Sequence, residues 1–108
     1  METYRINPNL TAFYFGGDID PGNAARSEEA RARWDTKTWL DLGMVVYAAH
    51  NGQSAIVYDT LCSPRQAAEV KDYLERELGI KKFTVVLSHW HLGHVGGNEL
   101  YRDFNIVA

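Results

Sequence analysis

The chain has 108 residues, of which 45% are hydrophobic and 23% charged, and its formal net charge is −3 at pH 7. This length suits one domain, residues 1–108, with a core of its own. No segment approaches the roughly 20 apolar residues of a membrane-spanning helix, and no broad basic face is present for nucleic acid, so we expect neither partner. The single cysteine, Cys62, predicts a small core residue and no disulfide framework. With no secretory-type start, we expect a cytoplasmic protein.

The first forty residues predict a hairpin followed by an excursion. Residues 3–6 and 10–15 are rich in apolar and aromatic side chains and flank a turn at 7–9, which is typical of paired strands. Residues 16–37 contain glycine, proline and aspartate, with a short helix expected at 27–34. We interpret this segment as an excursion over the edge of the sheet, anchored by Trp34 and Trp39.

The middle of the chain predicts a second hairpin. Residues 39–49 and 54–58 have β-type composition, and Asn51-Gly52 between them is a strong signal for a tight turn. His50 is expected at this turn, exposed to solvent and not bound to metal.

A helix with recognisable ends follows. Ser63 can cap it, Pro64 suits its first position, Gln66 completes a capping box and Gly79 suits its exit. Its apolar residues recur at helical spacing and predict one buried stripe, formed by Ala67, Val70, Leu74 and Leu78.

The last third predicts a strand at 83–87, covered on both faces because it is continuously apolar, and then a helix within 95–102 and a strand within 104–107. The order of elements therefore indicates an α+β fold, with a mixed sheet and helices mainly on one face.

Three of the four histidines lie within six positions, directly after the strand predicted at 83–87. His89 and His91 are one residue apart and project to the same side of extended backbone, and His94 comes from the turn beyond. Imidazole is a common ligand of zinc, and three imidazoles also suit nickel, copper, cobalt or iron(II). A catalytic zinc usually has three protein ligands and a water, and zinc sites commonly draw on histidine and cysteine. No further histidine or cysteine follows His94 in the sequence, so the site is expected to be incomplete within one chain. The alternative is a cluster of loop histidines without a functional ion.

The segment Ser88-His89-Trp90-His91-Leu92-Gly93-His94-Val95-Gly96-Gly97-Asn98 resembles the His-x-His-x-Asp-His signature of the metallo-β-lactamase superfamily. The earlier strand that ends in Asp59-Thr60 also agrees with that family. The resemblance implies half of an αββα sandwich, the N-terminal half, and a metal-dependent hydrolase. It implies one or two zinc ions bound through His89, His91 and His94, with Asp59 as a supporting residue.

Two departures from the family pattern limit this expectation. Gly93 stands where the family has aspartate, so the metal site is expected to be impaired, and no residue is assigned a catalytic role. The counterpart of the family's second half is missing, which would leave an apolar sheet face uncovered, with Val45, Tyr47, Ile56 and Tyr58 on it. We therefore expect a homodimer. A non-catalytic half-domain that self-assembles, or a unit of a longer protein, are the alternative interpretations.

Overall fold

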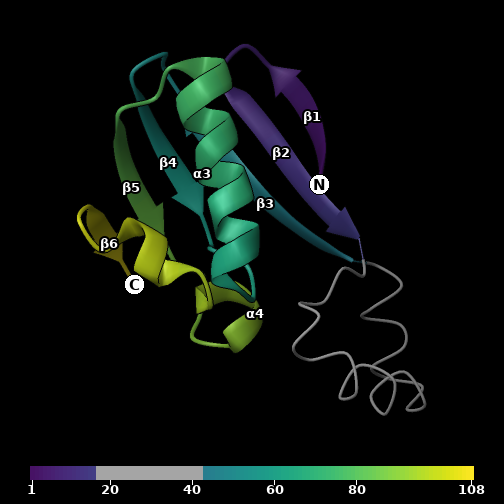
Figure 1. Cartoon of the computed structure of the whole chain (residues 1–108), viewed down its shortest axis with the longest axis vertical. Coiled ribbons are helices and arrows are strands. Elements are labelled where there is room, and N and C mark those ends of the chain that lie inside the picture. Colours follow the sequence, from purple (N-terminus) through teal and green to yellow (C-terminus); the bar gives the residue numbers. More distant parts are fainter. Residues whose placement is uncertain (17–42) are drawn as a thin grey trace.

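The computed structural model describes residues 1–16 and 43–108 (Figure 1). The helix expected at 27–34, together with Trp34 and Trp39, lies outside these described residues. The rest forms a six-stranded mixed sheet in which the strands lie side by side in chain order. The strands are β1 (Glu2–Asn7), β2 (Leu10–Gly16), β3 (Met44–His50), β4 (Ser54–Tyr58), β5 (Lys82–Val86) and β6 (Asn105–Val107).

Both predicted hairpins are confirmed. The pairs β1–β2, β2–β3 and β3–β4 are antiparallel, and Asn51 begins the β3–β4 turn by donating its backbone N–H to the carbonyl of Ser54 at 3.1 Å. The expectation for His50 was wrong, because it is the last residue of β3 and only 7% exposed. Its Nε2 lies 3.0 Å from Oγ1 of Thr11, so the imidazole is held inside by the neighbouring strand.

The predicted helix is also confirmed, as α3 (Pro64–Leu78). The hydroxyl of Ser63 accepts the backbone N–H of Gln66 at 3.3 Å, and Gly79 ends the helix in the left-handed conformation at φ 69°. Helix α3 connects the parallel strands β4 and β5 and lies along one face of the sheet (Figure 1). Ala67, Val70 and Leu74 are the buried members of the predicted stripe, while Leu78 is half-buried.

The helix predicted within 95–102 is instead two short pieces, α4 (Leu92–Val95) and the 3-10 helix η2 (Asn98–Tyr101). Gly96 and Gly97 separate them. A Cβ on Gly96 would lie 2.3 Å from the carbonyl oxygen of Cys62, and one on Gly97 would lie 2.3 Å from Cβ of Ala67. The chain therefore passes against the start of α3 at these glycines, and this close approach interrupts the predicted helix.

The core lies between the sheet and α3, and the other sheet face is open. Phe13, Val46, Val57 and Val85 are buried on the helix-covered face. Strand β5 was expected to be covered on both faces, which is wrong for this chain, since Thr84 and Val86 are only half-buried. The fold class is confirmed: a mixed sheet with helices on one face. Among the described residues, no helix combines the length and the apolar character needed to cross a membrane.

Candidate metal centre

The carboxyl ends of β4 and β5 bring Asp59 next to the histidine motif. These strands are parallel neighbours, so the residues that follow them meet at one edge of the sheet. Asp59 donates its backbone N–H to the carbonyl of Val86 at 2.9 Å, which fixes it beside Ser88. Asp59 and Leu61 have φ values of 66° and 63°, an uncommon conformation for residues with a side chain. The chain thus turns sharply at the point where its aspartate enters the site.

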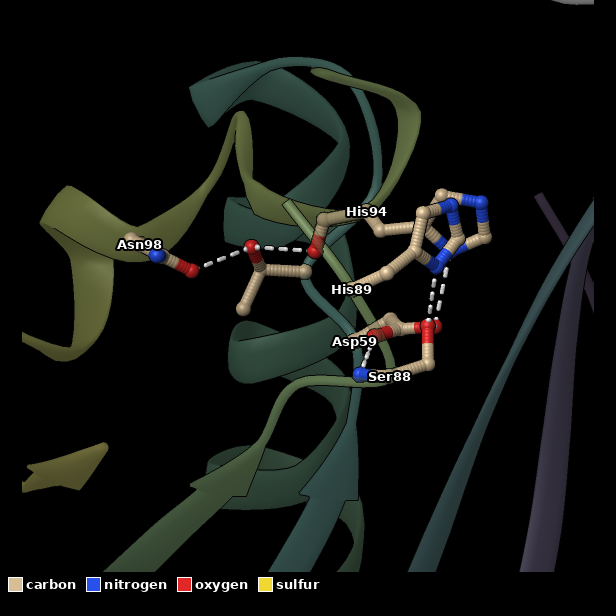
Figure 2. Close-up of polar contacts among 6 residues, drawn as sticks. Asp59, Ser88, His89, His94 and Asn98 are labelled. Atoms are coloured by element: carbon tan, nitrogen blue, oxygen red, sulfur yellow. Dashed lines mark hydrogen bonds and ion pairs between the residues drawn. The ribbon is translucent and has the colours of Figure 1, made fainter. Parts of the chain in front are cut away.

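Asp59 is the buried centre of a hydrogen-bond cluster, with 6% of its surface exposed. Its Oδ1 accepts the backbone N–H of Ser88 at 2.7 Å, and its Oδ2 accepts the hydroxyl of Ser88 at 2.8 Å. Oδ2 also lies 2.7 Å from Nδ1 of His94 (Figure 2). Both carboxylate oxygens are therefore engaged by the residues around the motif, as a carboxylate that orients metal-binding imidazoles would be.

A second set of hydrogen bonds holds the backbone of His94. Thr60 donates its N–H to the carbonyl of His94 at 2.8 Å, and its hydroxyl donates to Oδ1 of Asn98 at 2.7 Å. Gly96 donates its N–H to the carbonyl of Leu61 at 2.9 Å. The residues that follow β4 are thereby fastened to the segment that carries His94, although more than thirty positions separate them in the sequence.

The three imidazoles predicted from the sequence lie together. The ring centroids of His89 and His91 are 4.7 Å apart, and those of His89 and His94 are 4.0 Å apart. They line a cavity of about 390 Å³ that also touches Met44, Asp59 and the backbone of Gly93. His89 and His91 are exposed and His94 is half-buried, so the rings are open to solvent.

The donor groups of this site suit zinc, since neutral imidazoles supported by a carboxylate are common zinc ligands. As the side chains lie, however, the part of the chain that the structure describes has no group of three or more His, Cys, Asp or Glu placed to hold a metal ion.

Gly93 leaves space where the family signature has a carboxylate. A Cβ built on Gly93 would meet only Sδ of Met44, at 3.9 Å, which is an ordinary contact. The backbone there does not require glycine by its φ angle either, because Gly93 is not among the residues with positive φ. The position can therefore take a side chain.

His50 lies away from these rings. It borders a larger cavity, about 620 Å³, at the opposite ends of the same strands, together with Asn9, Lys82 and Asp103. His50 is thus separate from the cluster of His89, His91 and His94. Cys62 was expected in the core, but it is only partly buried, where the chain turns into α3.

Ser88, Thr60 and Asn98 were not predicted to be part of the site. A hydroxyl beside a histidine is too common to attract notice, and Asn98 is separated from Thr60 by 38 positions. One signal was available for Ser88, because residues that directly follow neighbouring parallel strands come together at one sheet edge.

Comparisons with known proteins agree with the sequence signature. Residues 39–107 match the family model of the metallo-beta-lactamase superfamily. Among solved structures, a metallo beta lactamase from Hirschia baltica aligns with a TM-score of 0.63 and 14% identity, over 97% of this chain and 40% of that one. VMB-1, crystallised at pH 5.5, aligns with a TM-score of 0.59 and 20% identity, over 94% and 38%. A comparison with curated proteins finds no match. The chain thus spans two fifths or less of the length of these two structures.

Proposed function

Since this chain belongs to the metallo-β-lactamase superfamily, we propose that it is a metal-dependent hydrolase unit with an incomplete and impaired metal site. The observation that carries this proposal is the convergence of three imidazoles on one cavity beside a buried carboxylate. His89, His91 and His94 would hold one or two ions of zinc or of another divalent transition metal. Asp59 would orient the ligands. We place the unit in the cytoplasm.

When bound, zinc would supply a Lewis acid and a water whose pKa falls to about 7. The chain's own residues can bind the ion and orient the imidazoles that hold it. The backbone of His94 is fixed by Thr60, and its Nδ1 is fixed by Asp59. The chain has less to offer for moving a proton, because both oxygens of Asp59 are already engaged and Gly93 brings no carboxylate. We therefore expect slow turnover or none.

Restoring the carboxylate tests this proposal. Gly93→Asp places an acid where the structure has room for a side chain, and Gly93→Asn is the matched control with the same shape and no charge. We expect Gly93→Asp, and not Gly93→Asn, to bind more zinc per chain and to gain rate on a panel of ester, lactone and phosphodiester substrates. If neither zinc content nor rate responds to the acid, the proposal of a disabled hydrolase site is wrong.

The open face of the sheet favours a second candidate, a non-catalytic half-domain that covers this face with a second copy of itself. Val45, Tyr47, Ile56 and Tyr58 are 40% to 52% exposed, as the sequence predicted for an uncovered face. A contiguous apolar patch usually marks an interaction surface, and a two-fold axis makes one such patch its own partner. The open-face side chains of β3 and β4 carry no charge that would oppose this pairing.

Native mass spectrometry, with zinc and after chelation, tests the second candidate. We expect a dimer that Ile56→Lys converts into a monomer, because the charge would be buried in the interface. Gln53→Lys is the matched control, since Gln53 lies exposed in the β3–β4 turn and receives the same charge. A wild-type monomer, or a dimer that tolerates lysine at position 56, would contradict this proposal.

A further inference from the structure

The hydrogen bonds around Asp59 define where the imidazole protons lie. A carboxylate only accepts hydrogen bonds, so Nδ1 of His94, at 2.7 Å from Oδ2, must carry a proton. The hydroxyl of Ser88 has one hydrogen, and it is directed at the same Oδ2, at 2.8 Å. If that hydrogen were turned away, two oxygens would face each other at this distance without a proton between them.

Ser88 then determines the state of His89. The Oγ of Ser88 lies 2.8 Å from Nδ1 of His89, and its hydrogen is already committed to Asp59 (Figure 2). The hydrogen of this second bond must therefore come from Nδ1 of His89. In their neutral forms His89 and His94 therefore both carry the proton on Nδ1, which leaves the lone pair of Nε2 free.

We propose that Ser88 is a positioning residue that relays the carboxylate of Asp59 to His89, so that one buried acid fixes the tautomer of two imidazoles. Asp59 fixes the tautomer of His94 directly, and it fixes that of His89 through the hydroxyl of Ser88. Within the described residues, no hydrogen bond fixes the ring of His91, which makes it an internal reference. The assignment of tautomers stands on the hydrogen bonds alone, whereas its use in holding a metal rests on the proposed function.

The relay would prepare the site for a cation. A metal bound through Nε2 requires the imidazole to carry its proton on Nδ1, and an imidazole that exchanges between tautomers meets this condition for only part of the time. Removing an outer hydrogen-bond partner of a metal ligand typically weakens metal binding by about 10-fold to 100-fold. Because Ser88 acts on one of the three rings, we expect a loss near the lower end, about 10-fold.

Nitrogen-15 NMR of the imidazole rings tests the relay in the full chain, freed of metal and at alkaline pH. We expect His89 and His94 to show a proton on Nδ1. Ser88→Ala should move His89 toward a proton on Nε2 and leave His94 unchanged, whereas Ser88→Thr, which keeps the hydroxyl, should retain the wild-type state. Ser88 is exposed, and unchanged backbone signals of α3 would show that the variants are folded.

The results separate the relay from the proposed function. A proton on Nε2 of His89 in the wild type, or a His89 ring that does not respond to Ser88→Ala, would overturn the relay. Zinc affinity, measured by competition with a chromogenic chelator, is the second readout. If Ser88→Ala changes the tautomer of His89 while zinc affinity stays the same, the relay fixes the tautomer but does not contribute to metal binding. If zinc does not bind to the wild type, the tautomer assignment stands and the proposed metal site fails.

Discussion

Gly96→Ala should destabilise the chain whereas Gly93→Ala should not, although only three positions separate the two glycines. A Cβ on Gly93 meets nothing closer than Sδ of Met44, at 3.9 Å. A Cβ on Gly96 would lie 2.3 Å from the carbonyl oxygen and 2.4 Å from the carbonyl carbon of Cys62. Ordinary contacts begin at 3.4 Å, so the intrusion at Gly96 is 3.4 − 2.3 = 1.1 Å. Backbone atoms cannot swing aside as a side chain can.

The magnitudes follow from these contacts. Overpacking of this kind costs about 1–3 kcal/mol of unfolding free energy. For a domain of this size, each kcal/mol shifts the melting temperature by about 4–8 °C, so Gly96→Ala should lower it by roughly 4–24 °C. Gly93 lies in α4, where alanine is favoured over glycine by about 0.5–1 kcal/mol. Gly93→Ala should therefore leave the melting temperature unchanged or raise it by a few degrees.

Thermal unfolding followed by far-ultraviolet circular dichroism measures both variants against the wild type. Gly97→Ala serves as a second test of close packing, because its Cβ would lie 2.3 Å from Cβ of Ala67 and 2.4 Å from the carbonyl oxygen of Thr60. The reasoning is refuted if Gly93→Ala destabilises the chain as much as Gly96→Ala does. Glycine at position 93 would then be required by the backbone, and placing an aspartate there would not restore a site.

Three further predictions concern the core and the buried polar groups. Leu74→Ala, at a side chain with 0% exposure, should lower the unfolding free energy by about 2–5 kcal/mol in urea titration. Tyr101→Phe should raise it by about 1 kcal/mol in the same assay, because the buried hydroxyl of Tyr101 has no hydrogen-bond partner among the described residues; equal or lower stability would mean that it has one. Burial, and then the charge of Arg5, lower the pKa of His50 below its ordinary 6.5. The neutral imidazole therefore stabilises the fold above pH 6.5, and this contribution is lost as the pH falls toward the pKa of His50 in the folded state. Melting temperatures across this range should fall less steeply in His50→Gln than in the wild type, and parallel curves would exclude His50 as the cause.

The elements with strong local signals could be predicted from the sequence. The capping serine, the proline after it and Gly79 define α3, and its apolar spacing identifies its buried side. The Asn51-Gly52 turn places β3 beside β4, and the histidine signature leads to the family. Each of these signals depends on neighbours within a few positions, where covalent geometry and side-chain pattern act directly.

The predictions that failed depended on contacts between distant segments. His50 was expected at an exposed turn, but the approach of Thr11 from β2 buries it. The helix expected within 95–102 is interrupted because two glycines pass against the chain near Thr60 and Cys62. Local composition contains no information about which distant backbone will occupy the space beside a residue.

The sequence by itself determined the donors of the candidate site, since it brings His89, His91 and His94 into one segment after a buried strand. Only the tertiary structure decided how they are held. Parallel pairing of β4 with β5 carries Asp59 to Ser88 and His94, across 29 and 35 positions of sequence. Hydrogen bonds require atoms within about 3 Å, and spacing along a chain cannot supply that distance until the sheet has formed.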